Sequence, residues 1–471
     1  MALCGTLAAL LCAVAPAPAG AAEAGVNLGS FASSQIAETK ALGSHWVRLF
    51  VSWRAMQPSP GTLDPNQLAS YEAALASLPA GTKVILDVVG SPEWETHSSN
   101  EHAPPANPND YAAFVGALAH RFGPHVAAYE IWNEEDASAW WAGGPNAMAY
   151  TELLKASYPV IKGAEPKATV VLGGLTGNDY QFLEGVYQAG GKGYFDAVGV
   201  HTDTACDVLS PYEFLRGPES RIVPDSFVGY REVHAVELAN GDDKPIWMTE
   251  LSWRTTEATC NEGAWAGQKP EGVSEAQQAA YLAQAYNCLE QAPYVQVALW
   301  FPLQDTGEVL SGLLRADGTR KPSFAAMRSY VRNGNQLSEQ CGVFTGPKIT
   351  VDSPADHTSY TGPLPIAVSA SSTLGVFRIR LEIDGKLIRN YDGPSYPQSL
   401  SGDLDWMGAK RISAGWHTLT IIAYDKQRNT AETSVSIFHG SSASAGRGTG
   451  HGRKATHPRR RRRVRRRTRR R

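Results

Sequence analysis

The chain has 471 residues, a formal net charge of −3 and 43% hydrophobic residues, enough for a large buried core and for two or three domains. Its basic residues are unevenly placed, because 14 of the 43 lie in residues 440–471, which contain no acidic residue. The rest of the chain has 29 basic against 46 acidic residues, so it gives no reason to expect a nucleic-acid-binding fold.

The first residues predict an export signal. An apolar stretch is followed by small residues with A-x-A character around residues 17–22. We therefore expect residues 1–23 to be a cleaved signal peptide and the protein to be secreted, either extracellular or associated with the cell envelope. A membrane anchor is the alternative, but the short apolar core and the prolines Pro16 and Pro18 argue against a span.

Short apolar runs alternate with longer amphipathic stretches from residue 25 to about residue 333. The runs predict strands over residues 25–31, 45–53, 83–90, 126–133, 169–175, 195–202, 245–252 and 295–303. The amphipathic stretches predict helices over residues 33–42, 66–78, 110–122, 147–163, 179–190, 226–239, 274–291 and 322–332, with Ser274 and Gln277 in a capping-box pattern. This α/β pattern predicts a (β/α)8 TIM barrel over residues 24–340. A doubly wound open sheet is disfavoured because no Gly-rich phosphate loop follows the first strand.

Two predicted strands end in carboxylates. The run at residues 126–135 ends in Asn133, Glu134 and Glu135, and the run at residues 245–253 carries Glu250 after three apolar residues. In an α/β barrel the carboxyl ends of the strands form the functional face, so the ends of strands four and seven should bring both glutamates there. Two carboxyl groups on one face are what hydrolysis of a glycosidic bond requires.

At these residues the chain resembles the clan of retaining glycoside hydrolases, in particular the cellulase-like family 5 and the xylosidase-like family 39. The resemblance spans the barrel and is carried by Arg48 in WVRLF, Trp132-Asn133-Glu134, His201 in VGVHTD, Glu250 in WMTELSW and Trp300 in VALWFPLQD. It implies that Glu134 is the general acid/base and Glu250 the nucleophile. It also implies a substrate-binding set of Arg48, Asn133, His201 and Trp300, with Asn133 on a sugar hydroxyl and Trp300 stacked on the sugar ring.

The chemistry of the residues agrees with these roles. A retaining mechanism needs two carboxyl groups about 5–5.5 Å apart, one protonated and one ionised. Glu134 would have an apolar setting that favours protonation, formed by Tyr129, Trp132 and Trp140. Arg48 is suited to keep Glu250 ionised. Structural alternatives are an ion pair for Arg48, a core position for His201 and packing at the barrel top for Trp300.

The chain also departs from the family pattern. It reads Asn-Glu-Glu-Asp where Asn-Glu-Pro is common, and Asp203 stands where a tyrosine usually contacts the nucleophile. Tyr212, from the following loop, is the candidate substitute for that tyrosine.

Four cysteines remain after the predicted signal, and three pairings are possible. Their positions around the barrel favour Cys206 with Cys260, in the loops after strands six and seven, and Cys288 with Cys341, beside neighbouring helices. The spacing lacks any CxxC element, so a structural zinc site is not expected.

After Cys341 the pattern changes to short β-rich runs, which predict a small sandwich over residues 347–439, with a hairpin turn at Asp384-Gly385. This region resembles bacterial immunoglobulin-like modules. Tyr391, Tyr396 and Trp406 are candidate carbohydrate contacts, and a spacer role is the favoured alternative. The Arg-rich tail at residues 440–471 predicts disorder and electrostatic attachment to an anionic cell envelope.

Together these features predict a secreted retaining β-glycosidase that acts on a poly- or oligosaccharide and needs no metal or organic cofactor. The alternative is a non-catalytic cell-envelope glycan-binding protein on the same scaffold. A nucleic-acid-associated protein that uses the Arg-rich tail is disfavoured, because it leaves the barrel residues without a role.

Overall fold

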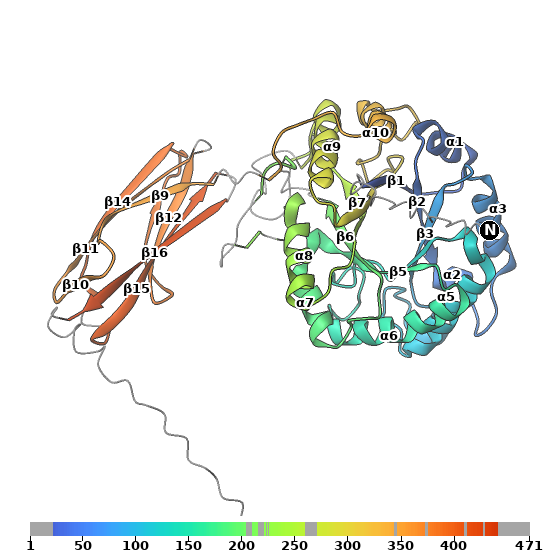
Figure 1. Ribbon diagram of the computed structural model, residues 1–471, viewed down its shortest axis with the longest axis horizontal. Coiled ribbons are helices and arrows are strands. Elements are labelled where there is room, and N and C mark those ends of the chain that lie inside the picture. The colour runs from blue at the N-terminus through green and yellow to red at the C-terminus, as the bar shows by residue number, and fades with distance from the viewer. Residues whose placement is uncertain are drawn as a thin grey trace, which may run out of the picture. The chain divides into compact units, whose positions relative to one another are not determined.

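The computed structural model describes residues 22–203, 210–214, 221–222, 224, 226–259, 271–342, 346–372, 375–408, 412–426 and 429–440 (Figure 1). The chain divides into two compact units between Thr345 and Gly346. The first unit contains a closed β-barrel and the second contains two β-sheets.

Eight parallel strands close the barrel in sequence order, and β1 pairs with both β2 and β8. The strands are β1 (Glu23–Leu28), β2 (Trp46–Ser52), β3 (Lys83–Val89), β4 (Ala128–Ile131), β5 (Thr169–Leu175), β6 (Ala197–Asp203), β7 (Ile246–Ser252) and β8 (Val295–Trp300). Figure 1 shows the helices as a ring around these strands. The longer helices are α1 (Ser33–Leu42), α3 (Pro65–Ser77), α5 (Pro108–Phe122), α6 (Ala147–Ala164), α7 (Tyr180–Gln188), α8 (Tyr230–Ala239), α9 (Glu275–Glu290) and α10 (Pro322–Asn333), and α2 (Trp53–Met56) and α4 (Glu93–Thr96) are single turns. The predicted TIM barrel is confirmed.

Capping side chains explain where several helices begin. The Asp64 side chain accepts hydrogen bonds from the backbone of α3, and Asn107 does the same for α5, each directly before a proline at the first helical position. At α9 the Ser274 hydroxyl accepts a hydrogen bond from the Gln277 backbone, at 3.2 Å. The Gln277 side chain donates to Tyr281 instead of the backbone of Ser274, so only half of the predicted capping box forms.

The inside of the barrel has an apolar layer and a polar layer. Near the strand starts the inward side chains form one apolar cluster, which consists of Trp46, Ile85, Ala128, Val171, Ala197, Trp247, Val297 and Leu299. Two residues further along, the inward positions of β2, β3 and β4 hold Arg48, Asp87 and Glu130, because successive side chains of a strand alternate between its faces. The polar layer therefore lies toward the carboxyl ends of the strands.

A disulfide bond joins Cys288 in α9 to Cys341 after α10, with the two Cα atoms 5.1 Å apart. This confirms one of the two predicted bridges, and it closes a loop across neighbouring helices of the ring. The other predicted pair, Cys206 and Cys260, lies outside the described residues.

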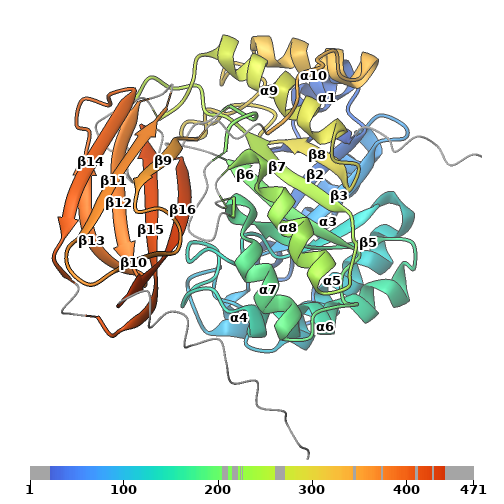
Figure 2. The ribbon, with the colours of Figure 1, turned by 60° about the vertical axis from the view of Figure 1, so that its left-hand side comes forward.

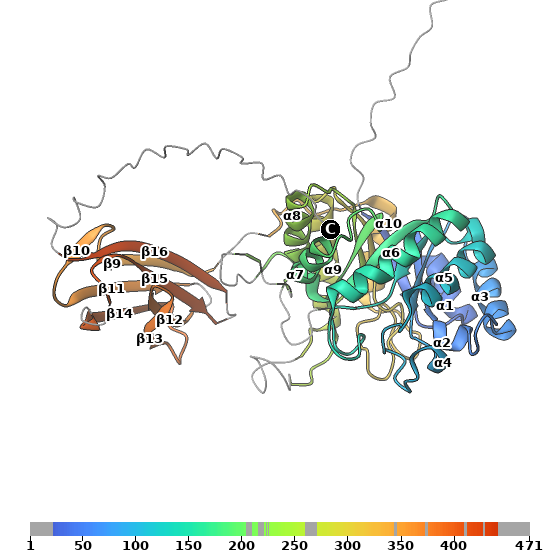
Figure 3. The ribbon, with the colours of Figure 1, turned by 90° about the horizontal axis from the view of Figure 1, so that it is seen from below.

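The second unit is a β-sandwich, whose two sheets Figures 2 and 3 show as separate layers. One sheet has the order β10-β16-β15-β12-β13 and the other β14-β11-β9. The strands are β9 (Lys348–Ser353), β10 (Thr358–Tyr360), β11 (Leu364–Ser371), β12 (Val376–Ile383), β13 (Lys386–Asp392), β14 (Ser399–Trp406), β15 (Gly415–Asp425) and β16 (Thr430–His439). Asp384 and Gly385 both have positive φ, 49° and 72°, as the predicted two-residue hairpin between β12 and β13 requires.

The candidate carbohydrate contacts of the sandwich pack within it. The Tyr391 hydroxyl donates to the Asp403 carbonyl at 2.7 Å, and the ring of Tyr396 stacks on Phe377. Trp406 packs near Tyr360, with ring centroids 6.4 Å apart. These contacts favour a structural role for the three side chains.

The barrel begins before the predicted boundary at residue 24. Ala22 is buried and its carbonyl accepts a hydrogen bond from Tyr330 at 3.0 Å, and β1 begins at Glu23. Residues 1–21 and the tail at residues 441–471 lie outside the described residues. Among the helices that the structure describes, none is both long and apolar enough to span a membrane.

Candidate active site

The ends of β4, β6 and β7 bring Glu134, His201 and Glu250 together. His201 Nδ1 lies 2.8 Å from Glu134 Oε1, and His201 Nε2 lies 3.8 Å from Glu250 Oε1. One side-chain oxygen of each glutamate and a ring nitrogen of His201 all lie within 4.8 Å of one another. Three of the predicted site residues thus form one cluster at the carboxyl face of the barrel.

The chain turns sharply where β4 ends. The strand stops at Ile131, two residues earlier than expected, and Trp132 and Glu134 have positive φ angles of 69° and 47°. Residues with side chains rarely adopt this conformation, and where they do it is often at a functional site. The turn places Asn133 against Arg48 and Glu134 against His201.

Arg48 occupies the centre of the polar layer and is fully buried. Its guanidinium donates through Nε to Glu130 (2.6 Å), through Nη1 to Asn27 (3.1 Å) and Glu250 (2.6 Å), and through Nη2 to Asp87 (3.0 Å) and Asn133 (2.9 Å). Burial would lower the pKa of Arg48, but the carboxylates of Glu130, Asp87 and Glu250 raise it above its usual value. Arg48 is therefore a permanent cation beside Glu250.

His201 is a second cation of the site. Burial would lower its pKa, but the charges of Glu250 and Glu134 and the hydrogen bond to Glu134 raise the pKa of His201 to about 9. Burial raises the pKa of Glu250, and the charges of His201 and Arg48 oppose that rise. Near neutral pH the imidazolium donates its Nδ1 proton to Glu134 Oε1.

Two glycines of β5 make room for the side chains of His201 and Glu135. A Cβ atom on Gly174 would lie 1.9 Å from His201 Nε2, and one on Gly173 would lie 2.2 Å from Glu135 Oε2. Real Cβ atoms never approach other atoms this closely, so only glycine fits at these positions. Gly174 therefore belongs to the site although it carries no functional group, and Gly173 makes room for the buried Glu135.

Glu134, His201 and Glu250 offer a cation three donor atoms, but their surroundings oppose a metal. His201 Nδ1 already hydrogen-bonds to Glu134 Oε1 at 2.8 Å, and the positively charged guanidinium of Arg48 lies 2.6 Å from Glu250. The arrangement suits acid–base and nucleophilic chemistry better than metal binding.

The prediction for Trp300 is wrong. Trp300 is fully buried and belongs to the core between the barrel and the helices, because Val297 and Leu299 are the inward residues of β8. Its ring packs near Trp253 and its Nε1 donates to the Ser311 carbonyl at 2.7 Å. It therefore has no free face for a sugar.

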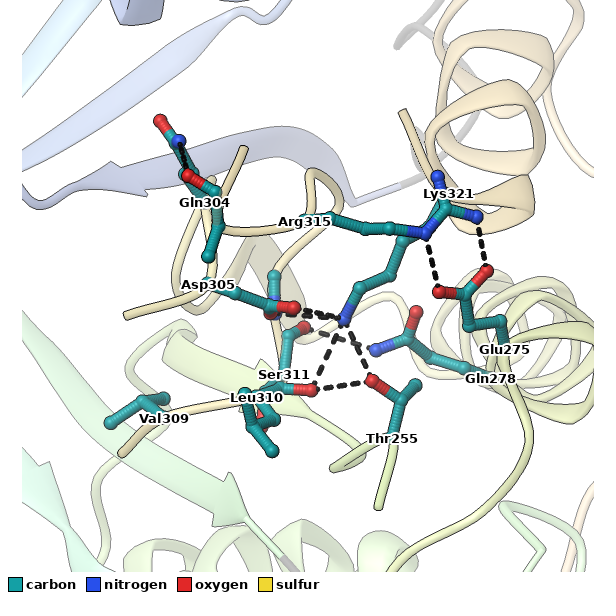
Figure 4. Close-up of polar contacts among 12 residues, drawn as sticks. Thr255, Glu275, Gln278, Gln304, Asp305, Val309, Leu310, Ser311, Arg315 and Lys321 are labelled. Carbon is teal, nitrogen blue, oxygen red and sulfur yellow. Dashed lines mark hydrogen bonds and ion pairs between the residues drawn. The ribbon is translucent and has the colours of Figure 1, made fainter. Parts of the chain in front are cut away.

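Polar contacts around Lys321 hold the loop after β8 (Figure 4). Lys321 Nζ donates to Asp305 Oδ1 (2.9 Å), Thr255 Oγ1 (2.8 Å) and the Leu310 carbonyl (3.2 Å). These bonds tie the loops after β7 and β8 together, and the same loop contributes the Ser311 carbonyl that accepts the Trp300 hydrogen bond.

The expected surroundings of Glu134 are also corrected. Tyr129 points to the helical side of β4, where its hydroxyl donates to the Leu118 carbonyl, and Trp132 is fully buried in the outer core. Tyr212 accepts a hydrogen bond from Asn287 at 2.8 Å, near the disulfide, so it does not substitute for the missing tyrosine. Glu134 instead contacts the positively charged ring of His201, at 2.8 Å.

Four further residues of the site were missed in the sequence: Asn27, Asp87, Glu130 and Thr249. Each is a polar residue inside an otherwise apolar strand, and that pattern was the available signal. A cavity of about 830 Å³ lined by Trp46, Lys83 and Trp247 lies at the other end of the barrel, where the strands start.

Known protein families match both units. Residues 24–192 match the cellulase family (glycosyl hydrolase family 5), and residues 347–421 match the bacterial Ig domain family. The barrel is a glycoside hydrolase of the family 5 type. Enzymes of its clan are retaining, and the glycoside hydrolase carries an immunoglobulin-like domain after the barrel.

Solved structures share the fold of this hydrolase. A family 39 glycoside hydrolase from Bacteroides cellulosilyticus WH2 aligns with a TM-score of 0.53 at 18% identity, covering 82% of this chain and 79% of that one. A family 5 (subfamily 18) enzyme from Streptomyces cattleya, in complex with GlcNAc, aligns with a TM-score of 0.51 at 16% identity, covering 72% and 84%. A family 39 β-xylosidase from Caulobacter crescentus aligns with a TM-score of 0.50 at 17% identity, covering 77% and 82%. No curated protein sequence matches the chain.

Proposed function

We propose that the protein is a retaining β-glycosidase of a poly- or oligosaccharide, with Glu250 as nucleophile and Glu134 as general acid/base. The observation that carries the proposal is the approach of one oxygen of Glu134 to within 4.8 Å of one oxygen of Glu250. Retaining enzymes hold their carboxyl groups about 5–5.5 Å apart, whereas inverting enzymes leave about 6.5–9.5 Å for a water molecule.

In the first step a Glu250 oxygen attacks the anomeric carbon, the bond to the leaving oxygen breaks, and that oxygen takes the proton of Glu134. Arg48 holds Glu250 Oε1 at 2.6 Å and thereby orients the other carboxylate oxygen for attack. His201 donates to Glu134 Oε1, which leaves Oε2 to carry the transferred proton.

In the second step water attacks the anomeric carbon of the glycosyl-enzyme. Glu134, now ionised, takes the proton of that water, and the Glu250 carboxylate is released. Asn133, fixed by Arg48 at 2.9 Å, is placed to donate its amide to a sugar hydroxyl.

Hydrolysis of aryl β-glycosides and of soluble β-glucans, xylans and mannans tests the proposal. We expect wild type to cleave at least one member of this panel, and Glu134→Gln and Glu250→Gln each to lose at least about 1,000-fold in kcat/KM on it. Glu152→Gln, which changes an exposed glutamate on α6, is the matched control and should be unaffected. Cleavage that survives Glu250→Gln would overturn the assignment of the nucleophile.

The same panel separates the glycosidase from the alternative of a non-catalytic glycan-binding protein. A binding protein would retain these glycans in affinity electrophoresis without releasing sugar. Both cations and both carboxylates of the cluster favour catalysis, because binding alone needs no pair of glutamates held this close.

We further propose that the protein is exported and that residues 440–471 attach it to an anionic cell envelope. The support is the sequence of the two ends, an apolar leader and a tail with 14 basic residues. A chain that ends at His439 should elute from a dextran sulfate column at clearly lower salt than the full chain, since counterion release scales with charge. Equal elution would contradict the role of the tail.

A further inference from the structure

Two successive side chains of β7, Thr249 and Glu250, both point into the barrel. The Thr249 hydroxyl contacts Glu130 and the Glu250 carboxylate contacts Arg48, and both partners lie in the polar layer. In a regular strand neighbouring side chains point to opposite faces, so β7 is irregular at this point.

The pairing of β7 with both of its neighbours explains the irregularity. Opposite β6, Val200 pairs with Met248 but His201 pairs with Glu250, so Thr249 is an extra residue in β7. The pairing with β8 shifts between Met248 and Leu251, over the same stretch. An extra residue in one strand is a β-bulge, and bulges redirect side chains beside active sites.

Glu130 connects this bulge to the guanidinium. Its Oε1 accepts the Thr249 hydroxyl at 2.8 Å and its Oε2 accepts Arg48 Nε at 2.6 Å. Asn27 adds a second tie, because its amide donates to the Thr249 carbonyl at 2.9 Å while its oxygen accepts from Arg48. Glu130, Thr249 and Asn27 are all at most 1% exposed.

We propose that Glu130 and Thr249 are positioning residues that hold the bulge of β7 in the form that directs Glu250 onto Arg48. The proposal rests on the proposed role of Glu250 as nucleophile. Without the Thr249–Glu130 bond the extra residue is free to shift along β7, and regular alternation would turn Glu250 away from the barrel interior.

Asp87 is the internal comparison for Glu130. It also accepts a hydrogen bond from Arg48, at 3.0 Å, and it is equally buried. In the part of the chain that the structure describes, however, the second oxygen of Asp87 has no hydrogen-bond partner. If both carboxylates only neutralised Arg48, removing the charge of Glu130 or of Asp87 should lower kcat equally. If Glu130 also holds the bulge, removing its charge should lower kcat more.

The experiment compares Thr249→Val, Thr249→Ser, Glu130→Gln and Asp87→Asn in the full chain, with Thr151→Val as control. Thr151 is a fully buried hydroxyl in α6 that bonds only within its own helix turn among the described contacts, so its change matches Thr249→Val in chemistry but lies away from the site. The substrate is the aryl β-glycoside of the panel that wild type cleaves fastest.

We expect Thr249→Val to lower kcat about 100-fold with KM within about threefold of wild type, because a displaced nucleophile slows chemistry more than binding. Thr249→Ser, which keeps the hydroxyl, should recover kcat to within about fivefold of wild type. Glu130→Gln should lose at least about tenfold more kcat than Asp87→Asn. A wild-type kcat in Thr249→Val, or equal losses in Glu130→Gln and Asp87→Asn, would overturn the proposal.

Crystal structures of Thr249→Val and Thr249→Ser test the same claim without any substrate. The contact between Glu250 Oε1 and Arg48 Nη1 should be lost in the valine variant and kept in the serine variant. If wild type cleaves nothing in the panel, the proposed function fails while this structural comparison still decides on the bulge. A contact that persists in the valine variant would overturn the role of Thr249.

Discussion

His201 carries a positive charge between two glutamates, and that charge acts on the pKa of Glu250. It lies 2.8 Å from Glu134 and 3.8 Å from Glu250, and its own pKa is raised to about 9. An imidazolium at this position lowers the pKa of the Glu250 carboxyl, against the effect of burial, which raises it. The pH range in which the nucleophile is ionised therefore depends on His201.

We predict that His201→Gln moves the acidic limb of the pH profile of kcat/KM to higher pH. Glutamine keeps a donor for Glu134 but removes the charge, so the pKa of Glu250 rises and a higher pH is needed to ionise it. Profiles of wild type and variant from pH 4 to pH 8 on the same aryl β-glycoside measure the shift. An unmoved limb, or a shift to lower pH, would show that the charge of His201 does not act on the nucleophile.

Glu135, which directly follows the proposed acid/base, should affect stability instead. Burial, followed by the charge of Asp136, raises its pKa well above 4.5, so the folded protein keeps the carboxyl neutral. The unfolded chain ionises this group above about pH 4.5, and the unfolding free energy of wild type should fall as pH rises from there toward the folded pKa.

Glu135→Gln removes this pH dependence. In that window the dependence amounts to at most about 1.4 kcal/mol of unfolding free energy for each pH unit. Urea unfolding of both proteins at pH 5, 6, 7 and 8 measures the difference, since Asp136 and Glu237 titrate in both. The variant should become steadily more stable relative to wild type as pH rises. Two parallel curves would mean that Glu135 is already ionised in the folded protein.

At the scale of single elements, β5 and β7 show how strands prepare the site. β5 contributes space through Gly173 and Gly174, and β7 contributes an extra residue that directs Glu250 inward. Both features act on the direction and the fit of side chains and not on their chemical type. They therefore determine whether a glutamate at a strand end points into the barrel, where it can act on a substrate.

Gly174→Ala should reduce kcat/KM at least about 100-fold, because its methyl group would displace His201 from the two glutamates. Gly163→Ala, at the end of α6, is the matched control, since no atom lies within 4 Å of the added methyl group. It should keep wild-type activity and gain slightly in helix stability. Full activity in Gly174→Ala would contradict the close approach of His201 to β5.

The sequence was sufficient to predict the strands and helices, but not the face of the strand to which every side chain points. Strand and helix positions follow from apolar periodicity, and Glu134 and Glu250 follow from their places at strand ends. His201 was identified by the resemblance to retaining glycoside hydrolases. Trp300 was misassigned because a strand end alone does not tell which face a residue occupies, and Leu299 takes the inward position of β8. The bulge at Thr249 and the positive φ of Trp132 depend on tertiary contacts, which no local pattern of residues records.

At the scale of the whole molecule, the proposed chemistry belongs to one of the two units. Every residue of the polar layer lies before Thr345, and the disulfide between Cys288 and Cys341 also closes within that unit. The second unit has a hydrophobic core of its own, built from both sheets of the sandwich. Each unit therefore has the core that independent folding requires.

A chain that ends at Thr345 should fold and keep kcat/KM within about twofold of the full chain on the best aryl β-glycoside of the panel. Circular dichroism confirms folding, and initial rates measure activity. The same truncation in the Cys288→Ser variant tests whether the first unit also folds without its disulfide bond. Loss of that bond should cost about 3–4 kcal/mol of stability. A tenfold fall in activity on truncation alone would show that the sandwich contributes to the site.

The most direct test of the proposed mechanism is the configuration of the first product. Proton NMR of the reaction of wild type with its best aryl β-glycoside resolves the two anomers before they equilibrate. Double displacement through Glu250 predicts that the β-anomer of the sugar appears first and the α-anomer only later, by mutarotation. If the α-anomer appears first, the enzyme inverts, and Glu250 does not form a covalent intermediate.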